Sequence, residues 1–122
     1  MTVKVLIVED EPIVARVLCR HVINAGHEAQ HAASIPEALT LARGTRFQLI
    51  LTDIDLPGIS GLAAVAILKK VGSAPVLVMT GNPIASLAED ARAMGAIGVI
   101  AKPFDFTVLN DWLARLPLLE LE

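Results

Sequence analysis

Residues 49–58 constrain this chain most, because an apolar run ends there in two carboxylates that a Pro-Gly turn follows. Leu49 to Thr52 is a short, continuous apolar run, which is typical of a strand buried on both faces of a parallel sheet. Asp53 would then lie at the carboxyl edge of the sheet, where open α/β folds place their ligands. A carboxylate there could be a nucleophile, a metal ligand or a helix cap, and the rest of the chain has to decide between them.

Composition favours a small α/β domain in a reducing compartment. Apolar residues make up 54% of the 122 residues and aromatic residues only 3%, so the core must be largely aliphatic, which suits strands packed between helices. The net charge of −3, without a basic block, argues against nucleic acid as a direct partner. Cys19 is the single cysteine, so no internal disulfide can form.

We expect one cytoplasmic domain over residues 1–122. No apolar run approaches the roughly 20 residues that a membrane span needs, and residues 1–4 lead into a strand pattern rather than a signal peptide. No linker, repeat or low-complexity segment divides the chain. Leu121 and Glu122 could be left by an expression vector, and we give them no weight.

Five apolar segments alternate with five segments of helical periodicity. We predict strands over residues 3–8, 28–33, 47–52, 75–79 and 97–101, and helices over 12–25, 35–44, 60–70, 83–94 and 106–116. The polarity of segment 28–33 indicates an edge strand. Because strands and helices alternate, right-handed crossovers predict a parallel sheet covered on both faces.

Local signals mark where the helices begin and which faces they bury. Pro12 suits the first turn of a helix, and Ser34 with Glu37 forms a capping-box pattern. Asn82 and Asp105 are predicted caps. The predicted buried stripe is Val14, Val17, Leu18, His21 and Val22 in the first helix, and Val108, Leu109, Trp112, Leu113 and Leu116 in the last.

Polar residues interrupt the apolar pattern at four strand ends. They are Glu9 and Asp10 after the first strand, Asp53 after the third, Thr80 after the fourth and Lys102 after the fifth. In a parallel sheet these ends meet at one edge, where three carboxylates would raise each other's pKa by repulsion. A divalent cation removes that repulsion, and Mg²⁺ fits best because it accepts carboxylates, waters and a phosphate oxygen. With a lysine and a hydroxyl donor added, the set predicts phosphoryl transfer onto a carboxylate.

These motifs, in this order, give the chain a clear resemblance to the CheY-like receiver domain of two-component response regulators. The resemblance covers essentially the whole chain. It lies in Val-Glu-Asp-Glu-Pro at 8–12, Thr-Asp-Ile-Asp-Leu-Pro-Gly at 52–58, Met-Thr-Gly at 79–81 and Ala-Lys-Pro-Phe at 101–104. It implies a flavodoxin-like (βα)5 fold, doubly wound, with strand order 2-1-3-4-5.

The resemblance also implies a role for each site residue. Asp53 would accept a phosphoryl group from a phosphohistidine. Glu9, Asp10, Asp53 and the backbone carbonyl of Asp55 would bind Mg²⁺. Thr80 would be the switch hydroxyl and Lys102 the ionic partner of the phosphoryl group. The peptide bond before Pro103 would be cis.

The implied partners are a sensor histidine kinase or phosphotransfer protein, and a downstream protein or output domain that docks on the fourth helix, fifth strand and fifth helix. Phosphorylation-dependent homodimerisation is a further possibility. The implied chemistry extends no further than the protein's own phosphorylation and autodephosphorylation.

Val99 departs from the family pattern. Many receivers carry an aromatic residue at the matching position, and its rotation accompanies phosphorylation. A β-branched valine has little to rotate, so we expect this domain to signal mainly through backbone changes after Thr80 and in the fourth helix. Gly81 has no side chain and leaves the phosphoryl pocket open to a donor or to water.

Simpler interpretations exist for individual residues. Acidic residues near a helix start can act as caps, and Thr80 alone could be a strand-end hydroxyl bonded to backbone. His21 fits a boundary position on the first helix, and Cys19 a packing position. His27 and His31 lie four residues apart but straddle a loop and a weak strand, which does not indicate a zinc site.

Three other functions are weighed against the receiver. A haloacid-dehalogenase-like phosphatase also uses Asp-x-Asp after a strand, but after its first strand and in a longer chain. A flavin-binding protein would need a phosphate loop after the first strand, where Glu9 and Asp10 would repel the flavin phosphate. A degenerate receiver that only binds partners would not need the intact set of acidic residues, Thr80 and Lys102. The sequence leaves open whether the chain acts alone or is part of a longer regulator or hybrid kinase.

Overall fold

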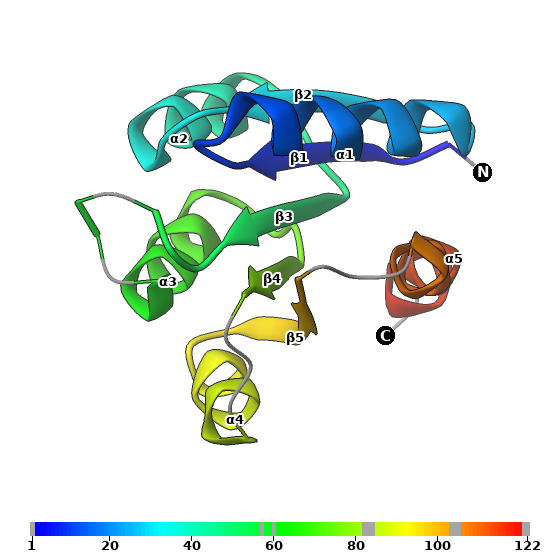
Figure 1. The fold of residues 1–122 in the computed structure, drawn as a ribbon. Helices are drawn as coiled ribbons and strands as arrows, with labels where there is room; N and C mark the ends of the chain where they lie inside the picture. The colour runs from blue at the N-terminus through cyan, green and yellow to red at the C-terminus, as the bar shows by residue number, and fades with distance from the viewer. Residues whose placement is uncertain (1, 57, 60, 82–84, 103–105, 121–122) are drawn as a thin grey trace.

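The computed structural model describes residues 2–56, 58–59, 61–81, 85–102 and 106–120. Five parallel strands form one sheet in the order β2-β1-β3-β4-β5, with helices along the connections between them (Figure 1). The strands are β1 (Lys4–Val8), β2 (Glu28–Ala32), β3 (Leu49–Asp53), β4 (Val76–Thr80) and β5 (Ala96–Ala101). The helices are α1 (Pro12–Asn24), α2 (Ile35–Gly44), α3 (Gly61–Val71), α4 (Ala85–Ala93) and α5 (Phe106–Glu120). The predicted fold class and strand order are confirmed.

Helices cover both faces of the sheet and divide the core into two clusters. Leu18 of α1 and Leu109 of α5 pack with Ile7 on one face, while Ala38 of α2 and Leu68 of α3 belong to the cluster on the other. Every residue of β3 and β4 is buried, as their continuous apolar runs predict for central strands. β2 lies at an edge and exposes most of its residues, which confirms its predicted position. Among the described residues no helix is long and apolar enough to span a bilayer.

The predicted start signals act where the structure describes them. Pro12 occupies the first turn of α1. Oγ of Ser34 accepts a hydrogen bond from the Glu37 backbone N–H at 3.3 Å, as a capping box requires. The Glu37 carboxylate reaches back to the N–H of Ala33, at 2.6 Å, rather than to that of the cap residue. The caps predicted at Asn82 and Asp105 lie outside the described residues, as does the predicted cis bond before Pro103.

Two predicted core residues are exposed. Val17 is 48% and Val108 40% accessible, so their placement in the buried stripes was wrong. Each precedes a leucine that does face the core, Leu18 in α1 and Leu109 in α5. Consecutive helical residues are about 100° apart around the axis, so the narrow stripe that each helix buries turns the preceding valine toward solvent.

The start of α3 is pressed against the loop that follows β3. A Cβ atom on Gly61 would overlap both the side chain and the carbonyl oxygen of Ile54, so only glycine fits there. Leu56, in the same loop, is buried in the core. The loop after Asp53 is therefore held between α3 and the sheet, which restrains the strand end that carries the two carboxylates.

Candidate functional site

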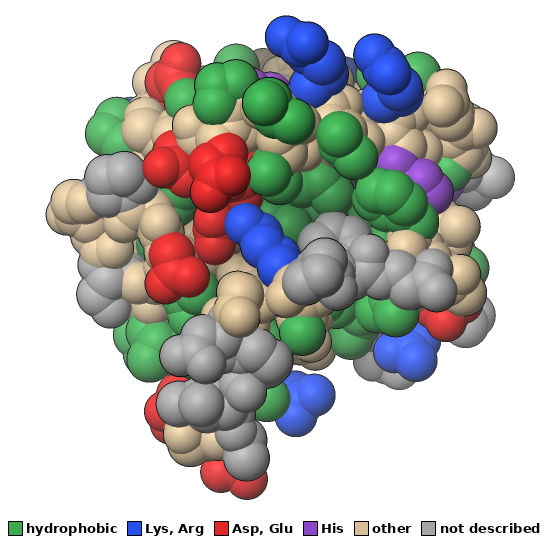
Figure 2. Space-filling view, viewed as in Figure 1, with side chains coloured by type: hydrophobic (Ala, Val, Ile, Leu, Met, Phe, Trp, Pro, Cys, Tyr) green, Lys and Arg blue, Asp and Glu red, His purple; other side chains and the backbone are tan. Residues whose placement is uncertain are grey.

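The polar residues that end the strands converge at one edge of the sheet. Glu9 follows β1, Asp53 is the last residue of β3, Thr80 the last of β4, and Lys102 follows β5. The side chains come from segments up to 93 residues apart, and Glu9, Asp53 and Thr80 are at most 4% exposed. Figure 2 shows acidic side chains gathered on this face of the molecule, beside a hydrophobic patch. The predicted convergence is confirmed.

Lys102 bridges two buried carboxylates. Its Nζ lies 2.9 Å from Oδ2 of Asp53 and 3.0 Å from Oε2 of Glu9, so one ammonium group serves both anions. Its backbone N–H donates to the carbonyl of Thr80 at 2.6 Å, which ties the end of β4 to the chain leaving β5. Lys102 is therefore held through both its backbone and its side chain.

Each of these carboxylates divides its two oxygens in the same way. Oδ1 of Asp53 accepts the backbone N–H of Asp55 at 3.1 Å, and Oε1 of Glu9 accepts that of Glu11 at 3.3 Å. The second oxygen of each carboxylate binds Lys102. The side chain of Asp55 is exposed, as predicted. The backbone group that bonds Asp53 is its N–H, not the carbonyl that the resemblance assigns to the metal. A backbone N–H two residues downstream orients both acids toward the same point.

Burial and pairing with opposite charges shift the pKa values of Glu9 and Lys102 in opposite directions. Burial raises the pKa of Glu9, the charge of Asp53 adds to the rise, and the hydrogen bond from Lys102 only partly offsets it. Burial alone would lower the pKa of Lys102, but its hydrogen bonds to Asp53 and Glu9 and their charges outweigh that effect and raise it. The lysine therefore stays charged at neutral pH, and a further cation beside Glu9 would oppose the rise in the pKa of its carboxyl group.

Three carboxylates lie close enough to share a cation. One ligand oxygen each from Glu9, Asp10 and Asp53 can be chosen so that all lie within 4.8 Å of one another, with Asp10 the most open of the three to solvent. All are hard oxygen donors, and their combined negative charge exceeds what Lys102 neutralises. The group could therefore hold a metal ion.

Histidines play parts in the structure that sequence reasoning did not foresee. Nε2 of His31, on β2, lies 2.7 Å from the backbone carbonyl oxygen of Glu9. Nδ1 of His27 accepts the backbone N–H of Val3 at 3.1 Å. The sheet order offered one signal for His31: β2 is the neighbour of β1, so its last residues must lie beside the end of β1 and the acidic residues that follow.

The remaining side chains follow the predictions. His21 is a half-buried boundary residue, stacked on Phe106 at 4.1 Å between ring centroids and 2.8 Å from Oδ1 of Asn110. Cys19 is half-buried and packs against the core cluster, and burial raises the pKa of its thiol. Trp112 is partly buried against the same cluster.

Val99 and Gly81 both have small side-chain volumes at positions that the sequence comparison singled out. Val99 is half-buried, packs on the cluster that contains α3 and α4, and pairs with Val78 of β4. Apart from its chain neighbours, no heavy atom of the described residues lies within 4 Å of the place a Cβ would occupy on Gly81. Gly81 thus places no side chain beside Thr80, and the position that is aromatic in many receivers holds only a short aliphatic side chain.

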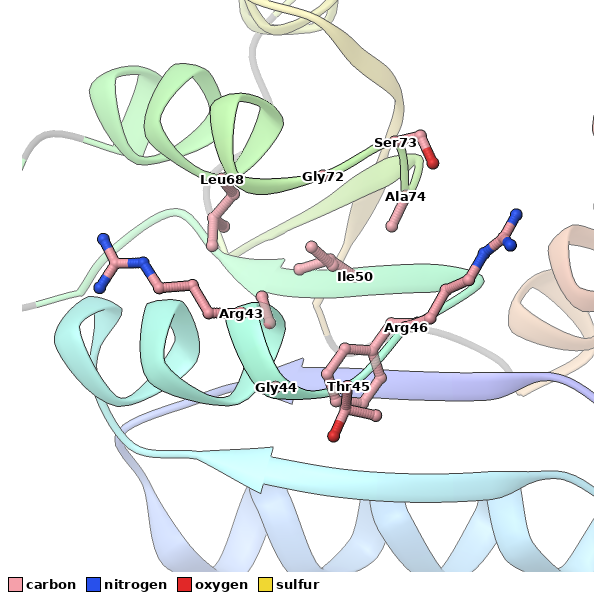
Figure 3. A pocket seen from close by; sticks show the side chains of 11 residues that line it. Arg43, Gly44, Thr45, Arg46, Ile50, Leu68, Gly72, Ser73 and Ala74 are labelled. Atoms are coloured by element: carbon pink, nitrogen blue, oxygen red, sulfur yellow. The ribbon is translucent and has the colours of Figure 1, made fainter.

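A separate hollow of about 300 Å³ lies at the opposite edge of the sheet, where β3 and β4 begin. Ile50 and Leu68 form part of its apolar lining, and Arg43 and Arg46 stand at its rim. Figure 3 shows the two arginine side chains extending outward in opposite directions, away from Ile50. Ligand sites usually bring several polar groups together, so this hollow is the weaker candidate.

Comparison with known proteins agrees with the geometry. A family model described as the response regulator receiver domain matches residues 5–114. The chain belongs to this family. It is 31% identical, over 121 residues, to sporulation initiation phosphotransferase F of Bacillus subtilis, covering 97% of each chain. The solved structure of chemotaxis protein CheY4 of Vibrio cholerae superimposes with a TM-score of 0.86 at 28% identity, covering 95% of this chain and 99% of that one.

Other relatives of this receiver domain are longer. The chain is 31% identical to the response regulator protein FleR of Pseudomonas aeruginosa over 116 residues, but spans only 24% of its length. It spans 55% of the probable transcriptional regulator Ycf29 of Pyropia yezoensis, at 30% identity. The predicted family is confirmed over its phosphatase and flavin-binding alternatives, and the chain is a receiver domain of the two-component signalling type.

Proposed function

We propose that this receiver domain accepts a phosphoryl group onto Asp53 from a phosphohistidine of a sensor kinase or phosphotransfer protein. The observation that carries the proposal is the shared ammonium group of Lys102, 2.9 Å from Asp53 and 3.0 Å from Glu9. A lysine so placed is next to the position where the transferred group's oxygens would lie once Asp53 is phosphorylated. Electrostatic stabilisation of this kind is commonly the largest contribution to such reactions.

The chemistry is a displacement at phosphorus. A carboxylate oxygen of Asp53 attacks, the phosphorus–nitrogen bond of the phosphohistidine breaks, and an acyl phosphate forms. Lys102 transfers its hydrogen bond from Asp53 to a phosphoryl oxygen, and Thr80 offers its hydroxyl from the end of β4. Glu9, Asp10, Asp53 and the backbone carbonyl of Asp55 would hold Mg²⁺, which when bound neutralises charge on the phosphoryl oxygens.

Hydrolysis of the acyl phosphate would return the domain to its unphosphorylated state. Gly81 places no side chain beside Thr80, so water can approach the acyl phosphate and hydrolyse it. The catalysis that we propose is limited to the domain's own phosphorylation and dephosphorylation, in keeping with a signalling module. A cytoplasmic location belongs to the same proposal, because the phosphodonor is a kinase or phosphotransfer protein.

The test is incubation with Mg²⁺ and acetyl phosphate, followed by intact mass. One phosphoryl group should be gained by the parent, and none by Asp53→Asn or in the presence of a chelator. Asp55→Asn is the matched control, because the side chain of Asp55 is exposed and should leave labelling intact. Labelling that survives Asp53→Asn would overturn the assignment, and a parent that gains nothing would favour the degenerate receiver.

We propose that the protein phosphodonor docks on the first turns of α1. Ile13 is 77% and Val17 48% exposed, and their four-residue spacing puts them on one side of the helix that begins directly after the acidic loop. Large apolar side chains that are exposed together often mark an interaction surface. A donor bound there could bring its phosphohistidine to Asp53.

Two variants of the same helix separate docking from chemistry. Ile13→Glu should slow phosphorylation by a phosphoprotein donor about tenfold or more, while phosphorylation by acetyl phosphate stays within twofold of the parent. Ile23→Glu is the control, because Ile23 is 55% exposed on α1 but lies at its far end. Equal loss in both variants would argue against a docking surface at the start of α1.

Signal output is proposed to pass through α4, β5 and α5 to a downstream protein, an output domain or a second copy of the chain. Val108 and Met94 are exposed apolar residues in this region. Since Val99 has little to rotate, backbone change after Thr80 would carry the signal. Thr80→Ala should make the amide NMR spectra of the phosphorylated and free forms more alike, and spectra that differ as much as in the parent would contradict this.

A further inference from the structure

We propose that His31 is a positioning residue for the acidic loop: by holding the carbonyl of Glu9 it sets the place of Asp10 and thereby the metal affinity of the site. The inference rests on the proposed metal site and extends it to a residue of the edge strand β2. His31 touches neither the cation nor the phosphoryl group, and acts only through backbone.

The first step is the hydrogen bond itself. Nε2 of His31 lies 2.7 Å from the carbonyl oxygen of Glu9. A carbonyl oxygen can only accept, so Nε2 carries the hydrogen, which assigns that nitrogen as the donor. The distance is at the short end of the range for N–H···O bonds.

The second step is that β2 holds both backbone groups of the same residue. The N–H of Glu9 donates to the carbonyl of Ala32 at 3.0 Å, and the carbonyl of Glu9 accepts from His31. The carbonyl of Glu9 and the N–H of Asp10 belong to one planar peptide unit. Fixing the carbonyl therefore fixes the direction in which the chain enters Asp10.

The third step is that Asp10 depends on its backbone for its position. Within the described part of the chain, its carboxylate has no hydrogen-bond partner, unlike those of Glu9 and Asp53. Glu11, the N-cap of α1, makes no side-chain capping bond, and its backbone N–H donates to Oε1 of Glu9 rather than to Asp10. The bond from His31 is a side-chain restraint on the peptide unit that leads into Asp10.

The affinity for a cation held by Asp10 would depend on this restraint. Ligands must be held within about 0.5 Å of their productive geometry for tight binding, and partners that orient ligands without touching the metal typically change affinity 10–100-fold. An ordinary exposed histidine of an edge strand would contribute to stability but would leave metal affinity unchanged.

The test measures Mn²⁺ binding to the full chain by electron paramagnetic resonance of the free ion, without any phosphodonor. His31→Ala and His31→Leu both remove the N–H that donates to the carbonyl of Glu9, and each should weaken Mn²⁺ binding about tenfold. His31→Gln can place an amide N–H near the position of Nε2 and should restore binding to within about threefold of the parent. Gln30→Ala is the control, because Gln30 is the exposed neighbour on β2 and should leave affinity unchanged.

A second readout separates positioning from stability. With acetyl phosphate as donor, His31→Ala should raise the half-saturating Mg²⁺ concentration about tenfold while the rate at saturating Mg²⁺ stays within threefold of the parent. Urea unfolding of the same samples checks that each variant is folded. Because both His31→Ala and His31→Leu lack the hydrogen-bond donor, the test can still be made if one of them does not fold.

Asp10→Asn distinguishes failure of this inference from failure of the metal site. If Asp10→Asn binds Mn²⁺ as the parent does, the proposed metal site itself is wrong. If Asp10→Asn loses binding while His31→Ala and His31→Leu keep the parent's affinity, the metal site stands and the role of His31 is overturned. Loss of affinity in both non-donating variants, with recovery in His31→Gln, supports it.

Discussion

Nζ of Lys102 lies 2.9 Å from Oδ2 of Asp53, and the same nitrogen lies 3.0 Å from Oε2 of Glu9. One ammonium group is thus shared by two buried carboxyl groups, which are also among the residues that would hold a divalent ion. Without metal, Lys102 is the counterion of these carboxyl groups. With metal, Lys102 and the metal ion compete for the same carboxylate oxygens. Opposite effects of a single substitution follow from these two roles.

Lys102→Met should destabilise the metal-free protein by about 1–3 kcal/mol, because Glu9 and Asp53 lose their shared partner while remaining buried. Adding Mg²⁺ should recover a large part of that loss by neutralising the same carboxylates. Urea unfolding with and without Mg²⁺ measures both effects. Lys70→Met, at an exposed position of α3, should change stability by less than about 0.5 kcal/mol under either condition.

The same Lys102→Met variant should bind Mg²⁺ about tenfold more tightly, since removing a nearby positive charge removes both repulsion and competition. Its phosphorylation by acetyl phosphate at saturating Mg²⁺ should nevertheless slow about 100-fold, because no ammonium group remains to stabilise the transferred oxygens. Titration by calorimetry and initial rates by intact mass measure the two quantities. Unchanged Mg²⁺ affinity would mean that Lys102 and the cation do not share carboxylates.

His27 should make stability depend on pH. Burial lowers its pKa, and its Nδ1 must be unprotonated to accept the N–H of Val3. Because the folded pKa lies below the unfolded value of about 6.5, this contribution is fully present above pH 6.5 and is lost as the pH falls through the folded pKa. The loss should be at most about 1 kcal/mol, the usual net value of one hydrogen bond.

His27→Asn keeps an acceptor near the position of Nδ1 but does not titrate. Urea unfolding between pH 7.5 and pH 5 should therefore show a shallower loss of stability in His27→Asn than in the parent. Other acidic groups titrate equally in both proteins, so the difference between the two curves isolates His27. Parallel curves would assign the pH dependence to other groups.

Gly98→Ala should destabilise the fold by about 1–3 kcal/mol through overpacking. A Cβ on Gly98 would lie 2.7 Å from Cζ2 and 3.0 Å from Cη2 of Trp112, so β5 and α5 would have to move apart. Gly44→Ala is the contrasting control, because no atom of another described segment lies within 4 Å of its Cβ position at the end of α2, and it should be neutral or stabilise by about 0.5 kcal/mol. Thermal unfolding followed by circular dichroism compares them. Recovery of stability in a Gly98→Ala, Trp112→Leu double variant would confirm the cause.

Much of the fold and of the site follows from where apolar runs stop. Asp53 and Lys102 each stand at the end of an uninterrupted apolar segment, and a parallel sheet brings such ends together whatever the details of packing. The fully buried runs of β3 and β4 likewise predict central strands. The residue at which a strand ends can be read from the sequence directly, because it depends only on where the apolar run stops.

What the sequence did not predict depends on contacts across the fold. Val17 has the right helical spacing to be buried, but how wide a stripe α1 buries depends on its neighbours, and the side chain is 48% exposed. The bond from His31 to the carbonyl of Glu9 joins a side chain to the backbone of another strand, for which no residue pattern exists. The sharing of Lys102 between two acids is likewise decided by side-chain geometry.

Trp112 is the only tryptophan of the chain, which contains no tyrosine. Its indole lies against Gly98, the residue next to Val99, and the guanidinium carbon of Arg115 is 4.8 Å from the centroid of its ring. Any shift of β5 against α5 would change the surroundings of this ring. The protein thus contains a fluorophore on the face of β5 opposite to Val99, and its intrinsic emission can follow a conformational change without a label.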